Sequence, residues 1–436
     1  MKSKIIIFWF RRDLRLFDNA GLSTALQHGL PVIPLFLFDS DILEKLTDKR
    51  DKRVGFIREA LVKMQEQLTE WRSSLLVKHG KPLNVWKQLV NDFDISAVYT
   101  NNDYEPYALQ RDAGVQAFLE SHGIAFLSLR DQVIFEKDDV RTASEQPYTV
   151  FTPYKKKWKQ KLIENNTLSL AYPVAPHNKN FWQHEPLPIP SLKETGFTPT
   201  HADFPSREIR DEIIQKYHLQ RDFPGIAGTS RIGVHVRFGT VSIRDLVKRA
   251  FQLNETWLDE LIWREFFMMI LYHFPHVQQR SFREKYDLIE WRNNENEYER
   301  WCAGETGYPL VDAGMRELNQ TGFMHNRVRM VTASFLTKHL LIDWRWGERY
   351  FAEKLLDYDL SANNGNWQWA AGTGCDAAPY FRVFNPVTQQ EKFDSDFIYV
   401  KKWVPEYATT AYPEPIVEHK FARQRAIDVY SRAVKG

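Results

Sequence analysis

The N-terminal part of the chain alternates strand-like apolar runs with helical patterns, and this alternation limits the possible folds most narrowly. Apolar runs at 4–10, 31–38, 75–79, 97–100 and 124–129 indicate buried strands. Between two of them, apolar residues recur at helical spacing at Ile57, Leu61, Met64, Leu68 and Trp71. Strands that alternate with helices pair in parallel through right-handed crossovers, with helices on both faces of the sheet. The pattern therefore predicts a doubly wound α/β domain.

The second half of the chain has a different pattern, which is almost wholly helical from about residue 205 onward. Helices are expected at 309–319, 325–341 and 346–358. Between about 135 and 200 the periodicity breaks and prolines accumulate, which favours an extended connector; the basic run at 152–161 favours a solvated helix face. We therefore predict an α/β plus all-α fold, with a sheet domain at 1–132, a linker at 133–200 and a helical domain at 201–436.

Composition excludes several classes of protein. The net charge of +2 means that any surface for a polyanion must be local. The chain has two cysteines, Cys302 and Cys375, which provide neither a disulfide framework nor the spacing of metal ligands. The apolar run at 5–10 is too short to span a membrane. We expect no membrane association, no metal and a reducing, cytoplasmic setting.

The residues after the first strand argue against a plain dinucleotide-binding domain. No Gly-x-Gly-x-x-Gly follows that strand; the segment at 11–19 reads Arg-Arg-Asp-Leu-Arg-Leu-Phe-Asp-Asn instead. A pyrophosphate site at this first turn is therefore not expected.

The stretch at 357–369 combines two aspartates, adjacent asparagines, a glycine and two tryptophans. Acids and amides supply hydrogen-bond acceptors and donors, and indole rings supply flat apolar walls. This combination favours a pocket for a flat, nitrogen-rich ring. The alternative from composition alone is an aromatic-rich turn between buried helices.

Three other groups are candidate sites. The segment at 228–233 has small and hydroxyl residues at a loop-to-helix junction, which favours either an anion site or an ordinary helix cap. A second group shares one face of an apolar helix, where an acid and an arginine need buried partners; its members are Glu260, Trp263, Arg264 and Phe267. A third, weaker group is Asn326 and Arg329, one helical turn apart.

Taken together, these motifs resemble those of the photolyase/cryptochrome flavoproteins. The matching segments, in family order, are 8–15, Thr229-Ser-Arg231, Trp263-Arg-Glu-Phe266, Met324-His-Asn-Arg327, Asp343-Trp-Arg345 and Asn363-Asn-Gly-x-Trp-Gln-Trp369. The match spans nearly the whole chain and is most similar to class I cyclobutane pyrimidine dimer photolyases. It implies light-driven DNA repair by a helical domain that carries FAD, reduced in the active form.

The resemblance assigns roles to residues around a folded FAD. The family's cofactor-binding positions correspond to Tyr217, Thr229, Ser230, Arg231, Ile232, Gly233, Trp257, Glu260, Arg264, Phe267, Asn326, Arg329, Asp357, Asp359 and Asn363. Among these, Arg329 and Asp357 are expected to form an ion pair beside the isoalloxazine. Asp359 is expected to accept a hydrogen bond from a ring N–H, and Asn363 to face flavin N5.

The same resemblance implies a lesion pocket and an electron relay. Contacts to a flipped-out dimer correspond to Glu260, Asn326 and Met330, its aromatic walls to Trp263 and Trp369, and a phosphate contact to Arg221. Glu260, Asn326 and Asn363 are the implied catalytic residues, and a raised pKa is expected at Glu260 because of burial. The relay corresponds to Trp291, Trp344 and Trp367. The implied partner is UV-damaged DNA, single- or double-stranded, bound by a monomer in the bacterial cytosol or nucleoid.

The chain departs from the family pattern at several places, and two of them bear on cofactor binding. Gly233-Val234 replaces the common Ser-Pro, which removes one phosphate hydroxyl, although a backbone N–H at Gly233 can replace it. The segment at 104–108 lacks the Asn-Glu pair that holds folate in one branch. A folate, deazaflavin or flavin antenna, or none, therefore stays open. The alternative functions are a cryptochrome-type blue-light receptor and a (6-4) photoproduct photolyase.

Overall fold

The computed structural model describes residues 3–200 and 202–435. They form two compact units that interleave along the chain. The first unit comprises Met1–Val140, Lys157–Glu208 and Ile232–Phe251, and the second comprises Arg141–Lys156, Ile209–Arg231 and Gln252–Gly436. The three-part division expected from the sequence stays a prediction. In the structure, the segments Lys157–Glu208 and Ile232–Phe251 belong to the same unit as the sheet.

The first unit contains the predicted parallel sheet, with strand order β3-β2-β1-β4-β5. Each pair of neighbouring strands is parallel. The strands are β1 Lys4–Phe10, β2 Val32–Asp39, β3 Leu76–Gly80, β4 Asp94–Asn101 and β5 Ala125–Leu129. The order changes direction at β1, so the chain winds first to one side of it and then to the other. This confirms the doubly wound α/β fold.

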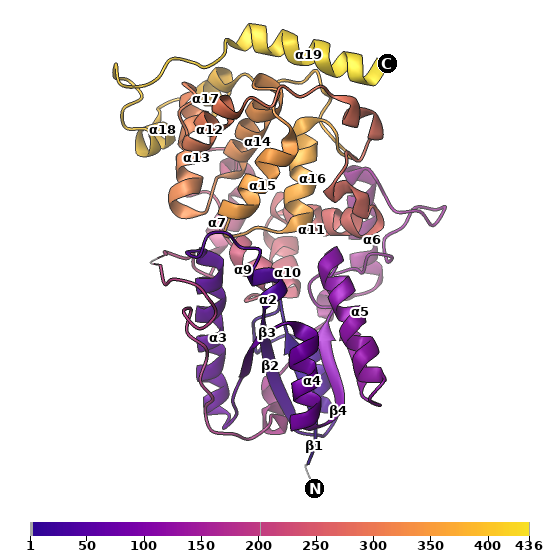
Figure 1. The fold of residues 1–436 in the computed structure, drawn as a ribbon. Helices are drawn as coiled ribbons and strands as arrows, with labels where there is room; N and C mark the ends of the chain where they lie inside the picture. Colours follow the sequence, from indigo (N-terminus) through magenta and orange to yellow (C-terminus); the bar gives the residue numbers. More distant parts are fainter. Residues whose placement is uncertain (1–2, 201, 436) are drawn as a thin grey trace. The chain divides into compact units, whose positions relative to one another are not determined.

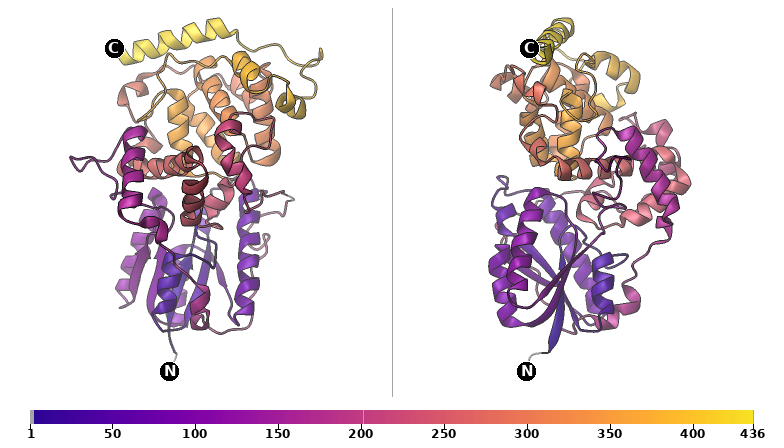
Figure 2. Two further views of the ribbon diagram at one scale, coloured as in Figure 1. Left: turned by 180° about the vertical axis from the view of Figure 1, so that it is seen from behind. Right: turned by 90° about the vertical axis from the view of Figure 1, so that its right-hand side faces the viewer.

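Helices cover both faces of the sheet (Figures 1 and 2). On one face, Ile5, Ile7 and Trp9 of β1 belong to a core with residues of α4 Pro82–Asp92 and α5 Pro106–Glu120. The alternate residues of β1 point the other way, where Phe8 lies against Gly21 of α1 Ala20–Gln27. Both faces of the strand are therefore buried, which explains its uninterrupted apolar run.

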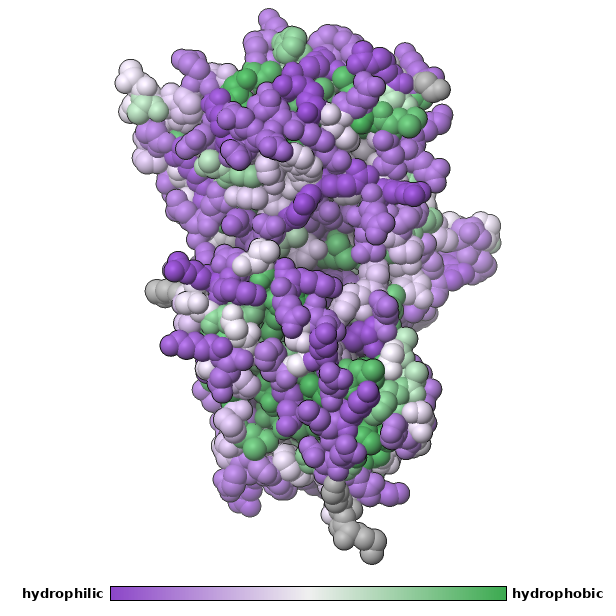
Figure 3. Space-filling view, in the orientation of Figure 1, coloured by the Kyte–Doolittle hydropathy of each residue, from purple (hydrophilic) through white to green (hydrophobic). Residues whose placement is uncertain are grey.

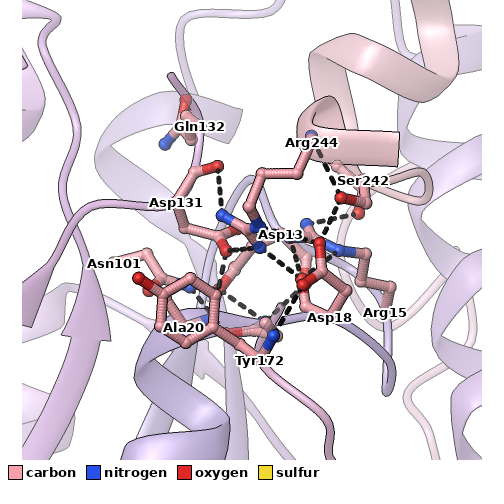
Figure 4. Close-up of polar contacts among 12 residues, drawn as sticks. Asp13, Arg15, Asp18, Ala20, Asn101, Asp131, Gln132, Tyr172, Ser242 and Arg244 are labelled. Atoms are coloured by element: carbon pink, nitrogen blue, oxygen red, sulfur yellow. Dashed lines mark hydrogen bonds and ion pairs between the residues drawn. The ribbon is translucent and has the colours of Figure 1, made fainter. Parts of the chain in front are cut away.

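The segment after β1 forms a buried ion-pair cluster rather than a phosphate loop (Figure 4). Arg15 and Arg244 bind opposite oxygens of Asp131, at 2.6 and 2.8 Å, and Arg244 also binds Asp18 at 2.8 Å. Asn101 donates to Asp13 at 2.6 Å. The cluster joins the carboxyl edge of the sheet to a helix far away in sequence, so the Arg-Arg-Asp-Leu-Arg motif has a structural role.

The first unit has further helices, of which α2 and α3 connect β2 to β3 and the others follow β5 in the chain. They are α2 Ser40–Leu43, α3 Lys52–Glu70, η2 Ala175–Asn180, α9 Gly233–Phe238 and α10 Ile243–Leu253, with the short η1 Thr167–Ser169. The basic run at 152–161 is helical, as expected, within α6 Phe151–Glu164.

The second unit is helical, which confirms the all-α part of the prediction. Its elements are α7 Asp211–Gln215, α8 Tyr217–Gln220, α11 Glu255–His273, η3 Pro275–Gln278, η4 Glu284–Leu288, α12 Glu295–Ala303, α13 Pro309–Thr321, α14 Asn326–Ser334, η5 Phe335–His339, α15 Trp344–Lys354, α16 Leu360–Ala371, α17 Pro386–Phe393, α18 Ile398–Trp403 and α19 His419–Lys435. A large apolar core includes Trp301, Phe335, Trp344 and Trp367.

Two predicted helices have different ends in the structure. The helix expected at 325–341 is α14 followed by the π-helical turn η5. The helix expected at 346–358 is α15, which starts earlier because Asp343 caps it and accepts from Arg345 N at 3.0 Å. It also ends earlier, at Lys354.

Most of the surface seen in Figure 3 is hydrophilic, with apolar side chains scattered among charged ones. Within residues 3–200 and 202–435, no helix is long and apolar enough to cross a membrane.

The Asp131 cluster yields a stability prediction. Burial alone would raise the pKa of Asp131, but Arg15 and Arg244 hold it below the ordinary value. Asp131→Asn leaves two buried guanidinium groups without their shared anion, and we expect a loss of about 3–5 kcal/mol in the free energy of unfolding. Urea denaturation at neutral pH measures this loss.

The matched control is Asp92→Asn, because Asp92 lies exposed at the end of α4. It should change stability by less than about 0.5 kcal/mol. Equal stability of the two variants would contradict a structural role for the cluster.

Candidate active site

The stretch at 357–369 forms a turn and then helix α16, rather than the aromatic-rich turn that composition left open. Asp359 caps the helix, and its carboxylate accepts from Ala362 N at 3.2 Å and from the Ser361 hydroxyl. Gly372 follows the helix with φ of 89°, a left-handed conformation that suits glycine. Local capping interactions therefore fix both ends of this amide-rich helix.

Two amides on one face of α16 bind the neighbouring segment. Asn364 and Gln368 lie one turn apart, and both donate to the carbonyl of Val277 at 2.9 Å. Gln368 also accepts from Phe282 N at 2.8 Å. These buried side chains satisfy backbone groups of η3 and of the loop that follows it. Their structural role was not expected from the sequence, which identified only their neighbours as functional.

A hydrogen bond to the adjacent helix α15 fixes the orientation of the Asn363 side-chain amide. Its Nδ2 donates to the carbonyl oxygen of Glu348 at 3.0 Å. A carbonyl accepts and does not donate, so the amide nitrogen must face Glu348. The amide oxygen is therefore left as the acceptor for a ligand N–H.

Asn363 lines a cavity together with most of the residues that were expected around the flavin ring. The cavity lies between α14, α15 and α16, and its wall includes Asn326, Arg329, Met330, Asp357, Asp359, Asn363, Trp367 and Trp369. Acids, an amide and indole rings thus face one space. Trp367 is 2% exposed and Trp369 is only half-buried, so the two tryptophans differ in their access to solvent.

The expected ion pair at this cavity is present. Nη2 of Arg329 binds both carboxylate oxygens of Asp357, at 3.0 and 3.2 Å. Nε of Arg329 donates to the carbonyl of Met324 at 2.7 Å, which fixes the guanidinium. One positive and one negative group are thereby held beside the space for a ring.

The candidate face of α11 is built around two contacts. Glu260 forms an ion pair with Arg221 at 2.5 Å. Burial is the main influence on Glu260 and raises its pKa, as expected, although Arg221 opposes the shift. Trp263 stacks on Phe151 with ring centroids 3.5 Å apart and planes 9° apart. Phe151 was not identified from the sequence, because a lone aromatic before a basic helix gives no specific signal.

The remaining cofactor candidates lie near α11 or in the segment at 228–233. Tyr217 is buried and lies under the Arg221 guanidinium, and Trp257 is buried in the first turn of α11. Arg231 binds Glu317 at 3.3 Å. Thr229, Ser230 and Arg231 belong to the second unit, whereas Ile232 and Gly233 belong to the first. No side chain forms a capping hydrogen bond at Ile232, the N-cap residue of α9. The segment at 228–233 is therefore not the ordinary side-chain cap that the sequence left open.

The three relay tryptophans belong to one packed region. Trp344 and Trp367 lie in the same apolar core, and the half-buried Trp291 packs against it. Trp291 also packs against Tyr430 of α19, with ring centroids 5.9 Å apart. Of the three, Trp367 lines the cavity, Trp344 is fully buried and Trp291 is half-buried.

The segment expected near an antenna has its polar groups bound to protein partners. Glu105 binds Arg12 at 2.9 Å and Arg237 at 2.7 Å. The Tyr107 hydroxyl donates to Asp39 at 2.7 Å. Among the described residues there is no group of three or more His, Cys, Asp or Glu side chains placed to hold a metal ion.

A parallel-sheet unit followed by a helical unit with an acid-, amide- and indole-lined cavity defines a flavoprotein of the photolyase type. Two family models match: "DNA photolyase" over residues 6–174 and "FAD binding domain of DNA photolyase" over residues 257–411. The chain belongs to the DNA photolyase family.

Individual relatives agree with this assignment. A deoxyribodipyrimidine photo-lyase of Halobacterium salinarum is 37% identical over 98% of this chain and 99% of its own length. A class III photolyase structure from Agrobacterium tumefaciens superposes with a TM-score of 0.85 at 30% identity, covering 100% of this chain and 99% of the other. An archaeal photolyase from Sulfolobus tokodaii, solved with two FAD molecules, gives 0.82 at 34% identity, with 98% and 100% covered.

The cavity residues fit the edge of an isoalloxazine ring. That edge presents alternating N–H and C=O groups, and the cavity presents carboxylates, a guanidinium and an amide oxygen whose direction is fixed. The chemistry of this donor and acceptor set therefore suits FAD.

Glu348 gives a pH prediction for the region behind Asn363. Burial raises the pKa of Glu348 to about 7, against a weaker lowering effect of the hydrogen bond from Asn364. A carboxyl with a raised pKa stays protonated in the folded state at pH values where it ionises in the unfolded state. The free energy of unfolding should therefore fall as pH rises from about 4.5 to about 7.

Urea denaturation across this pH range should show that Glu348→Gln removes part of this slope. Glu353→Gln is the matched control, since Glu353 is exposed on the same helix. A slope that is identical in wild type, Glu348→Gln and the control would contradict the raised pKa.

Proposed function

We propose that this protein repairs cyclobutane pyrimidine dimers in UV-damaged DNA, using light and a reduced FAD held in the helical unit. The observation that carries the proposal is the cavity in which Asn326, Met330, Asn363 and Trp369 lie together. Family membership establishes the fold, and this set of side chains is the basis for the proposed class of substrate.

In this proposal the ring of FAD lies in the cavity. When bound and reduced, FAD supplies the light-excited electron donor. Asp359 and the Arg329–Asp357 pair orient the ring through its polar edge. Asn363, whose amide nitrogen is bound to the Glu348 carbonyl, offers its oxygen to the N–H at N5 and so holds that proton in place.

The dimer is expected to leave the duplex and enter the same pocket, a manner of binding that photolyases exemplify. Glu260 hydrogen-bonds a carbonyl of the dimer and stabilises the negative charge that develops there. A raised pKa favours the protonated carboxyl, which is able to donate. Arg221 contacts a DNA phosphate, after exchanging its present partner Glu260 for that anion.

The alternatives fit the site less well. A (6-4) photolyase relies on paired histidines, whereas here His325 is followed by Asn326. His325 is 4% exposed and accepts from Arg327 N at 3.2 Å as the cap of α14, and burial lowers its pKa to about 4. It is therefore a neutral structural group. A blue-light receptor of the plant type carries aspartate, not asparagine, at the position of Asn363.

The finer points of the proposal concern the relay and the setting. Trp291, Trp344 and Trp367 pass electrons from the surface to the flavin when it must be reduced. The substrate is damaged DNA, single- or double-stranded, bound by a monomer. The proposed location is the bacterial cytosol or nucleoid, where a chromosomal DNA substrate is present.

The proposal is tested with reduced protein and two oligonucleotides, one with a cyclobutane dimer and one with a (6-4) photoproduct. Repair is measured by chromatography after incubation in blue light or in the dark. We expect light-dependent loss of the cyclobutane dimer only. No light-dependent loss of that dimer, in protein shown to hold FAD, contradicts the proposed function.

Glu260→Gln should slow dimer repair by about 10²-fold or more, because the carboxyl's donor is replaced by a weaker one beside the developing charge. FAD content, read from the absorbance spectrum, should stay near that of the wild type. The control is Glu255→Gln, an exposed position on the same helix. Loss of FAD in Glu260→Gln would reassign Glu260 as a structural residue.

A further inference from the structure

Phe151 is a buried side chain without a role in the reaction proposed above, and it lies flat against Trp263. The two ring centroids are 3.5 Å apart and the ring planes 9° apart. Phe151 also meets Phe266, on the same helix as Trp263, at 5.8 Å with the planes 73° apart. Trp263 itself is half-buried. One face of the Trp263 ring is therefore covered by Phe151, while part of the indole remains accessible.

Contacts at the start of α6 fix the position of Phe151. Its backbone N–H donates to Oδ2 of Asp376 at 3.0 Å. One helical turn later, Nζ of Lys155 binds Asp259 of α11 at 2.9 Å. An ion pair and an aromatic stack thus join the first turn of α6 to α11.

Asp376 lies in the turn that follows α16, the helix that carries Trp369. Arg283 donates to two backbone carbonyls of the same turn, from its own N–H at 3.1 Å and from its guanidinium at 3.2 Å. Through Asp376, Phe151 therefore connects the two helices that carry the expected aromatic walls of the lesion pocket, Trp263 on α11 and Trp369 on α16.

We propose that Phe151 is a positioning residue for the lesion, which fixes the ring of Trp263 and, through Asp376, its spacing from Trp369, so that the pocket selects a flipped-out pyrimidine dimer. This inference rests on the proposed function and deepens it. It assigns a role in substrate selection to a residue that does not line the cavity.

The physical basis is preorganisation of the aromatic wall. An indole that is free to turn loses this freedom when a ligand packs on it, and the loss weakens binding. The stack on Phe151 fixes the ring before the dimer arrives. Leucine at this position is also apolar and only somewhat smaller, but it has no flat face, so it fills the space without fixing the plane of Trp263.

The test measures DNA binding in the dark by FAD-loaded protein with oxidised flavin, so that no dimer is repaired. The probes are two labelled oligonucleotides of one sequence, with and without a cyclobutane pyrimidine dimer, and the readout is fluorescence anisotropy. Phe151→Leu should weaken binding of the dimer probe by about tenfold and leave binding of the undamaged probe unchanged. Asp376→Ala should shift the two affinities in the same way, because it releases the N–H of Phe151.

Two comparisons separate positioning from stability. In a Trp263→Ala background, Phe151→Leu should cause no further loss of dimer affinity, because the ring that Phe151 positions is gone. Phe397→Leu is the matched control, since Phe397 stacks on Tyr407 in the same unit with ring centroids 5.1 Å apart. This control should keep the dimer affinity of the wild type.

The inference is overturned if Phe151→Leu binds the dimer probe as the wild type does. It is also overturned if Phe151→Leu weakens both probes equally, or costs as much affinity in the Trp263→Ala background as in the wild type. Light-dependent repair of the dimer probe by pre-reduced wild type reports on the proposed function separately. A wild type that repairs the dimer, with Phe151→Leu unimpaired in binding it, leaves the proposed function standing and removes the role of Phe151.

Discussion

The candidate site depends on the close approach of three helices, which two glycines permit. A Cβ on Gly365 of α16 would lie 2.1 Å from the ring of Phe267 on α11. A Cβ on Gly347 of α15 would lie 2.1 Å from the ring of Trp367 on α16. Because neither side chain exists, α16 packs directly against aromatic rings on one helix and against the backbone of the other. That approach brings Asn363 within hydrogen-bond distance of the Glu348 carbonyl.

The polar side chains of α16 have different contacts on its two faces: those on one face bind neighbouring backbone, and those on the other line the cavity. Asn364 and Gln368 bind backbone groups of η3 and of the loop that follows it, and so hold the helix in place. Asn363 and Asp359 line the cavity and offer acceptors to a bound ring. The two tryptophans also differ: Trp367 is buried and meets Trp301, whereas Trp369 remains accessible to a substrate. One short helix thus carries both the side chains that fix its position and the side chains that line the cavity.

The sequence predicted the sheet well, because apolar runs and alternating helices report burial directly. It predicted α16 poorly, since asparagine, glycine and tryptophan are weak helix formers, and the helix depends on tertiary hydrogen bonds. The Arg329–Asp357 pair was anticipated from family resemblance and is present. The Arg221–Glu260 pair and the Phe151–Trp263 stack were not, because their partners are far apart in sequence and no local pattern connects them.

The central claim, that close packing of α16 creates the flavin site, is tested most directly by the FAD content of Gly365→Ala. The added methyl must push α16 away from Phe267, an overpacking that costs about 1–3 kcal/mol. Gly114→Ala is the control, because a Cβ there meets nothing within 4 Å. We predict that Gly365→Ala folds but loses most of its FAD, measured as the ratio of flavin to protein absorbance, whereas the control keeps it. Full FAD content in Gly365→Ala would contradict the claim.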